Sequence, residues 1–186
     1  MKLSNVLTLS LSAAAIAAPS PDNIDSRANL PGLNTLQSKY ANAIIAQAKE
    51  DGVGPHGCQA AIATAMVEVR LTNYPFYAVL TLVQTSLIMY ANTKVKESLK
   101  YPHDRVGSDL DHIGLFQLRA SVYNNIACDM DAACSAGLFL GAMKKINGWE
   151  TMAVGTLCQK VQRTAYPDRY AKQVGLATNV CKAGGL

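Results

Sequence analysis

The strongest constraint on the fold is a stretch of small and apolar residues that ends in a carboxylate. Residues 58–67 read CQAAIATAMV, and Glu68 follows them. A helix that is apolar on nearly every face has to be surrounded by other elements, so this segment predicts a buried central helix. A carboxylate at the end of such a helix is costly to ionise, and we expect desolvation to raise the pKa of Glu68.

A carboxyl group that keeps its proton near neutral pH can act as a general acid. Glycosidases use such a group to protonate the leaving oxygen of a sugar linkage. The alternative is structural, in which Glu68 merely lies at an exposed helix end or pairs with Arg70. Glu68 is therefore a candidate catalytic acid, with the structural role left open.

Apolar residues recur at helical spacing in most of the remaining chain. Asn34 or Thr35 can serve as the N-cap of the first predicted helix. Helices around one buried helix, with a small irregular lobe between them, favour a mainly α class, either α+β or all-α. Helices are predicted over 36–50, 58–68, 131–146, 150–164 and 168–180, and a loop or short hairpin over 92–111.

Length and charge narrow the range of partners. The chain has 186 residues, 49% of them hydrophobic, which suits one globular domain rather than disorder. The net charge of +4 favours an acidic polymer as a partner. No Lys/Arg cluster is large enough for nucleic acid, and the basic tail is too thin for a membrane-surface helix. We expect a monomer.

The N-terminus has the pattern of a secretory signal. Residues 1–17 combine a short basic start, an apolar stretch and a small-residue cleavage site. The alternative is a buried N-terminal helix. Residues 18–33 carry Pro and Gly among polar residues and predict a flexible leader. This division predicts a secreted, extracellular protein with one domain over 34–186.

Secretion permits disulfides, and the chain has five cysteines. Cys128 and Cys134 enclose a short loop and are predicted to form a bridge. Two of Cys58, Cys158 and Cys181 can form a second one, and the sequence does not say which two. An odd number leaves one cysteine without a partner.

Residues 103–112, HDRVGSDLDH, concentrate carboxylate and imidazole groups. Such groups can bind zinc or calcium, but their spacing matches no ligand motif, and a solvated turn-forming loop explains them equally. A catalytic Cys/His pair is disfavoured because each cysteine has a structural role. We therefore expect neither a metal ion nor an organic cofactor.

Four motifs, in the same order, make the chain resemble a known family. They are ATAMVE at 63–68, YPHDRVGSD at 101–109, GLFQ at 114–117 and VQRTAYP at 161–167. Together they resemble secreted lysozyme-like proteins, the fungal muramidase and actinobacterial peptidoglycan-lytic domains. These domains are distant relatives of goose-type lysozymes and soluble lytic transglycosylases. The resemblance covers residues 35–181 and implies a lysozyme-like α+β fold.

The resemblance also implies a function. It places the general acid on Glu68 and the substrate at the β-1,4 linkage between N-acetylmuramic acid and N-acetylglucosamine in peptidoglycan. It suggests Asp109 or Asp111 as a second carboxylate that positions water or stabilises charge, without choosing between them. The remaining expected substrate contacts are Gln117, Arg119, Gln162 and Tyr166.

The chain departs from the family pattern at several positions. Leu118 replaces a second Gln after GLFQ, although Arg119 is kept, and Leu110 and His112 replace residues of the acidic motif. These changes concern substrate contacts more than the acid. Leu110, Leu118 and an insertion at 69–84 favour a rival hypothesis, a non-catalytic secreted glycan-binding protein or effector on the same scaffold.

An insertion separates Glu68 from the motif MYAN at 89–92. Residues 69–84 are 16 codons that can begin with a splice donor, contain a branch point and end with an acceptor. We interpret them as a translated, unspliced intron, because their removal restores the family spacing. The competing interpretation is a genuine apolar lid over the cleft. Inserted beside the acid, the segment is expected to block the cleft or displace Glu68.

Overall fold

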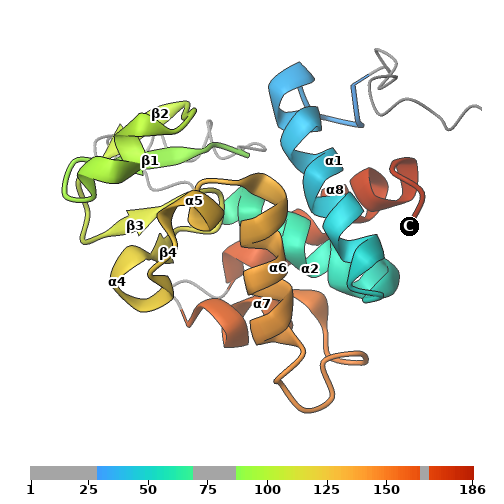
Figure 1. The fold of residues 1–186 in the computed structure, drawn as a ribbon. Coiled ribbons are helices and arrows are strands. Elements are labelled where there is room, and N and C mark those ends of the chain that lie inside the picture. Colours follow the sequence, from blue (N-terminus) through green and yellow to red (C-terminus); the bar gives the residue numbers. More distant parts are fainter. Residues whose placement is uncertain (1–28, 69–86, 164–167) are drawn as a thin grey trace, which may run out of the picture.

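The computed structural model describes residues 29–68, 87–163 and 168–186. This part of the chain is mainly helical, as the sequence predicts. Figure 1 shows the long helices on one side and a small lobe of short strands and one-turn helices on the other. The expected signal peptide, most of the leader and the insertion 69–84 lie outside the described residues.

The helical side consists of five helices of the described ranges. They are α1 (Thr35–Glu50), α2 (Gly54–Val67), α6 (Ala132–Met143), α7 (Val154–Gln162) and α8 (Asp168–Ala183). The lobe contains the short strands β1 (Tyr90–Asn92), β2 (Arg105–Gly107), β3 (His112–Ile113) and β4 (Leu118–Arg119). It also contains the 3-10 helix η1 (Lys96–Lys100) and the helices α4 (Ala120–Tyr123) and α5 (Ile126–Asp129).

Helix α2 is the buried central helix that the sequence predicts. Its residues from Ala60 to Met66 are all buried, and α2 packs against α1, α6, α7 and α8. Helices α7 and α8 approach each other closely at Gly155, where an added Cβ would lie 2.9 Å from the Cα of Ala171. The end of α2 is thereby fixed from several directions.

Helix α1 begins at a capping box. The side chain of Asn34 accepts a hydrogen bond from the backbone of Gln37, and the Gln37 side chain accepts one from the backbone of Asn34. Of the two N-cap candidates, Asn34 is therefore the one used. Leu30 and Leu33, in the range expected to be a leader, are buried in the core.

The strands of the lobe form two separate pairs. Strand β1 pairs with β2 in parallel, and β3 pairs with β4 in antiparallel orientation. A hairpin within 92–111 is therefore wrong, because η1 carries the chain back so that β2 runs in the same direction as β1. The antiparallel pair comes later, at 112–119. The Gly114 amide donates to the Tyr90 carbonyl at 2.8 Å and joins the two pairs.

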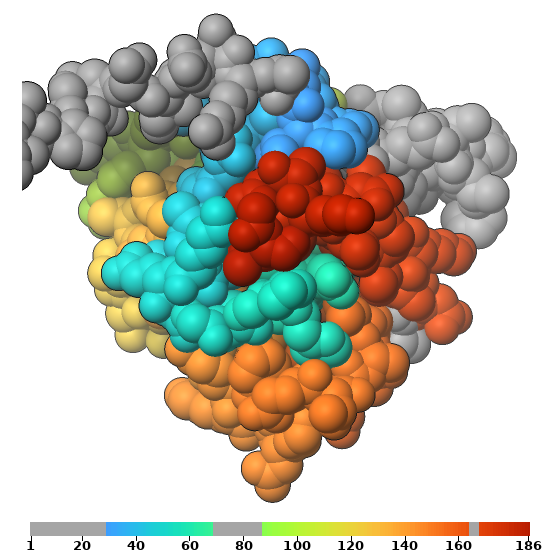
Figure 2. Space-filling model, turned by 90° about the vertical axis from the view of Figure 1, so that its right-hand side faces the viewer, coloured from blue at the N-terminus to red at the C-terminus, as the bar shows by residue number. Residues whose placement is uncertain are grey.

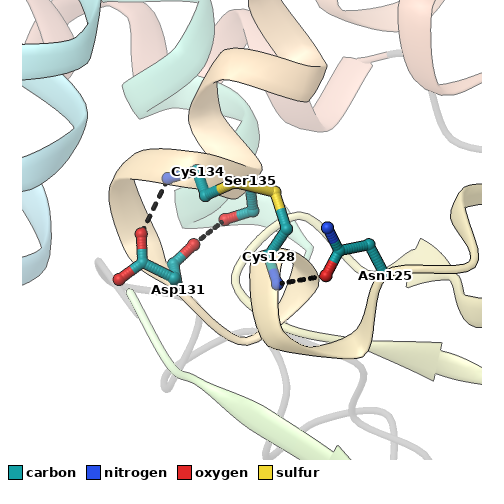
Figure 3. Close-up of a disulfide and its surroundings, with 5 residues drawn as sticks. All are labelled: Asn125, Cys128, Asp131, Cys134 and Ser135. Carbon is teal, nitrogen blue, oxygen red and sulfur yellow. Dashed lines mark hydrogen bonds between the residues drawn. A yellow bond between two sulfur atoms is a disulfide. The ribbon is translucent and has the colours of Figure 1, made fainter.

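Two disulfides cross-link the described chain. The predicted bridge between Cys128 and Cys134 is confirmed, and it closes the corner between α5 and α6 (Figure 3). The second joins Cys58 in α2 to Cys181 in α8 and leaves Cys158 free and buried. Of the three cysteines whose pairing the sequence leaves open, Cys58 and Cys181 are therefore the two that form the bridge.

Helix α8 closes the helical side of the molecule. Figure 2 shows the C-terminal residues, in red, directly against α1 and α2 in blue to green. The Lys49 side chain in α1 donates to the Gly184 carbonyl at 2.7 Å, just beyond the end of α8. Within the described ranges, no helix is both long and apolar enough to cross a membrane.

Candidate functional site

The candidate acid, Glu68, lies at the C-terminal end of α2. Its backbone N–H donates to the Thr64 carbonyl at 3.1 Å, and Glu68 is the residue that caps the helix. Thr64 is completely buried, whereas Glu68 is half-buried. The carboxylate therefore lies where the buried helix reaches the edge of the core, as the sequence analysis expects.

Tyr170 of α8 contacts this carboxylate. Its hydroxyl donates a hydrogen bond to Oε1 of Glu68, and the Tyr170 side chain has no exposed surface. The disulfide between Cys58 and Cys181 holds α2 and α8 together farther along both helices. A donor on a buried, cross-linked helix fixes the orientation of the carboxylate, as a second residue commonly does for a catalytic acid.

Cys158 of α7 packs against α2, the helix that ends next to Glu68. Its Sγ is 3.3 Å from the Ala60 carbonyl, and the side chain is fully buried. Burial, with a smaller contribution from the nearby charge of Glu68, raises the pKa of Cys158 to about 11. The thiol is therefore neutral over the physiological range and offers Glu68 no positive charge.

Gln117, an expected sugar contact, lies in a turn after β3. Its side-chain amide donates to the Gly114 carbonyl at 2.9 Å, and the residue is 9% exposed. Its backbone has a φ of +48°, which is uncommon outside glycine. The amide nitrogen thus holds the turn with one of its two N–H donors.

Gln162, a second expected contact, connects α7 to this turn. Its side-chain amide donates to the Phe116 carbonyl at 3.2 Å. Phe116 is buried and stacks on Phe139 of α6, with ring centroids 5.2 Å apart. Gln162 and the 114–117 segment are therefore neighbours, as a shared role at one site requires.

Asp111 and Arg119 pair with each other. The Arg119 side chain donates to one carboxylate oxygen of Asp111, and the Ser121 backbone donates to the other at 2.7 Å. Desolvation alone would raise the pKa of Asp111. The hydrogen bonds from Ser121 and the bond and charge of Arg119 outweigh it and hold the pKa well below its usual range. Both oxygens of Asp111 are thus engaged within the β3–β4 region.

Asp109, the other candidate second carboxylate, belongs to a loop held by Asn92. The Asn92 side chain is 1% exposed and donates to the carbonyls of Asp109 at 3.1 Å and His112 at 3.0 Å. Leu110, between them, has a φ of +46°. Asn92 therefore fixes the backbone of the loop, while Asp109 itself is half-buried.

Tyr166, an expected substrate contact, falls in 164–167, outside the described residues. Among the residues that are described, no three His, Cys, Asp or Glu side chains are grouped to hold a metal ion.

Two residues of the site were missed by the sequence analysis. Tyr170 lies in a predicted helix but 102 positions from Glu68, and no local pattern connects them. Asn92 is the last residue of the MYAN motif, and a polar residue ending a buried strand was a usable signal for a structural role.

No protein-family model matches the chain, and no curated protein matches it. The resemblance to lysozyme-like proteins therefore rests on the four motifs and their order.

Proposed function

We propose that the chain is a secreted, lysozyme-like glycosidase that cleaves the peptidoglycan backbone, with Glu68 as the general acid. The substrate is the β-1,4 linkage between N-acetylmuramic acid and N-acetylglucosamine. The observation that carries the proposal is the hydrogen bond from buried Tyr170 to Glu68 at the end of the buried helix α2. Such a carboxyl group is oriented and only partly solvated, which suits proton donation.

In the proposed reaction, protonated Glu68 gives its proton to the glycosidic oxygen. The bond to the leaving sugar breaks as positive charge develops on the other ring. Attack by water then gives hydrolysis, and attack by the substrate's own hydroxyl gives lytic transglycosylation. The chemical nature of the products, reducing muramic acid or anhydromuramic acid, distinguishes the two reactions.

Two groups of the helical side approach Glu68. The Tyr170 hydroxyl donates a hydrogen bond to its carboxylate, and the neutral thiol of Cys158, whose pKa burial raises to about 11, lies close enough to interact with its charge. Asp111, by contrast, is bonded to Arg119 and Ser121. This engagement supports a structural role for Asp111 and favours Asp109 as the carboxylate that assists water.

The net charge of +4 also supports an anionic polymer as substrate. Peptidoglycan carries carboxylates on its muramic acid units and peptides. Within the described domain, Gln117 and Gln162 are the residues that we propose to contact this polymer.

The decisive experiment is lysis of a Gram-positive cell suspension, followed as loss of turbidity. Replacing Glu68 by Gln removes the proton donor while keeping size and hydrogen bonding. We expect a rate loss of at least about a hundredfold, the usual contribution of a general acid. The matched control is Glu50→Gln, because Glu50 is likewise a glutamate at the C-terminal end of a helix but is exposed.

The second candidate function is glycan binding without cleavage. It is favoured by Leu110, 49% exposed where the family has a polar residue, and by Leu118, which is buried. Pull-down with purified peptidoglycan separates the candidates. Binding with no lysis, unchanged by Glu68→Gln, would decide for the binding protein.

A further inference from the structure

Asp129, at the end of α5, is a buried carboxylate without a partner. Its side chain has no exposed surface, and neither carboxylate oxygen accepts a hydrogen bond from the described part of the chain. Buried polar groups are nearly always paired, so an unpaired carboxylate needs an explanation. Ionising it in place would put an uncompensated charge in the core.

The corner that holds Asp129 is rigid. Figure 3 shows the disulfide between Cys128 and Cys134 with a capping hydrogen bond on each side. The Asn125 side chain accepts from the Cys128 backbone at 3.1 Å, and the Asp131 side chain accepts from the Cys134 backbone at 2.8 Å. Asp129 lies between these fixed points and cannot easily turn its carboxylate towards solvent.

The backbone of Asp129 lies against the 114–117 turn. A Cβ on Gly114 would be 2.0 Å from the Asp129 carbonyl oxygen, so only glycine allows this approach. Gly114 also accepts the hydrogen bond from the Gln117 side chain and donates to Tyr90. Asp129 therefore supports the turn that carries a candidate substrate contact.

No neighbouring charge of the described chain compensates Asp129. Helix α6 carries no charged side chain, and Tyr123 of α4 is exposed. The charged residues of η1, namely Lys96, Glu97 and Lys100, are also exposed. Asp131 caps α6, and His112 of β3 is half-buried. Burial, the cause of the shift, raises the pKa of Asp129 to about 6.

We propose that Asp129 is a pH-sensitive latch that holds α5 against the 114–117 turn when neutral and loosens this contact when it ionises. The contact between α5 and the turn is then tightest in acid. The inference concerns stability, and only its consequence for glycan cleavage rests on the proposed function. Its test therefore uses no activity measurement.

Proton linkage determines whether the stability rises or falls with pH. The folded state binds the Asp129 proton more tightly than the unfolded chain, whose Asp titrates at about 3.9. The stabilisation is fully present below about pH 4 and is lost as the pH rises to about 6, the folded-state pKa. A shift of about two pKa units corresponds to roughly a hundredfold in the folding equilibrium.

The experiment measures hydrogen-exchange protection factors in the full chain at pH 4.5 and pH 7. In the wild type, we expect protection of the Gly114 and Met130 amides to fall by up to roughly twentyfold over this interval. In Asp129→Asn, which mimics the neutral acid, the fall is absent. Asp131→Asn is the matched control, because Asp131 is exposed and Asn also caps a helix.

Two outcomes would contradict the proposal that Asp129 ionisation loosens the contact. One is the same fall in protection in the wild type and in Asp129→Asn. The other is an Asp131→Asn variant that abolishes the fall as Asp129→Asn does. If Asp129→Asn does not fold, the wild type decides alone, since constant protection between the two pH values contradicts an ionising Asp129.

Discussion

Tyr170 donates a hydrogen bond to Glu68 across 102 residues of sequence. The tyrosine belongs to the last helix and the carboxylate to the end of the second, and a disulfide joins the same two helices. The position of Glu68 therefore depends on the C-terminal part of the chain as much as on its own helix.

Tyr170→Phe removes the hydroxyl and keeps the ring. We expect lysis to slow by about tenfold, because a lost hydrogen bond to a carboxylate is worth about 1–2 kcal/mol. A hydrogen bond to the ionised form favours that form, so its loss should move the alkaline limb of the pH–activity profile upward. Tyr123→Phe, at an exposed tyrosine, should leave rate and profile unchanged.

The insertion gives a second prediction. A variant lacking residues 69–84 should lyse cells, whereas the full chain should be poorly active or poorly folded. The reason is that a displacement of the acid by even about 1 Å can cost roughly a hundredfold in rate. Parallel turbidity and solubility measurements compare the two. Equal activity would contradict this interpretation, and a mature transcript that still contains these codons would contradict the retained intron.

The two disulfides should differ in their effect on stability. The Cys58–Cys181 bridge closes a loop of more than 100 residues, whereas Cys128 and Cys134 are 6 positions apart. Loop-closure entropy predicts a loss of about 4–5 kcal/mol when the first pair is replaced by Ala and about 2 kcal/mol for the second. Denaturant unfolding measures both, and equal losses would refute the entropic account.

Asp111→Asn should destabilise the β3–β4 region rather than only slow a reaction. The pKa of Asp111 is lowered in the fold, so its stabilisation is present above about pH 4 and is lost as the pH falls further. We expect about 1 kcal/mol near neutral pH, since Arg119 is 44% exposed and the pair is screened. The difference in unfolding free energy from wild type should shrink below pH 4. A difference that stays constant would exclude the ion pair as its cause.

Gly114→Ala should be strongly destabilising. Gly114 has a φ of +78°, and the added methyl would overlap the Asp129 carbonyl at 2.0 Å. We expect a loss of at least about 3 kcal/mol in thermal or denaturant unfolding. Gly141→Ala in α6 meets no atom within 4 Å and should instead stabilise by about 0.5–1 kcal/mol. A mild effect at Gly114 would mean that α5 can move away from the turn.

The helices could be predicted because their sequence patterns are local. Residues 58–68 carry an apolar composition that only a central position satisfies, and Asn34 precedes a helical repeat with a capping partner at Gln37. The predicted 168–180 helix likewise corresponds to α8, which extends to Ala183.

The lobe and the contacts between distant residues could not be predicted in the same way. The parallel pairing of β1 with β2 depends on η1 between them, and strands of two or three residues have too little pattern to detect. The partner of Glu68 and the choice of Cys181 for Cys58 both depend on how α8 crosses α2. The burial of Asp129 depends on the approach of Gly114, which no spacing in the sequence indicates.

The bridge between Cys58 and Cys181 also determines what a protease can do to this domain. A single backbone cut anywhere between these two cysteines yields fragments that stay covalently attached. Such a nicked molecule would keep its full mass on a non-reducing gel and separate into pieces only after a thiol is added. Resistance to shedding fragments would be a useful property for the secreted protein that we propose.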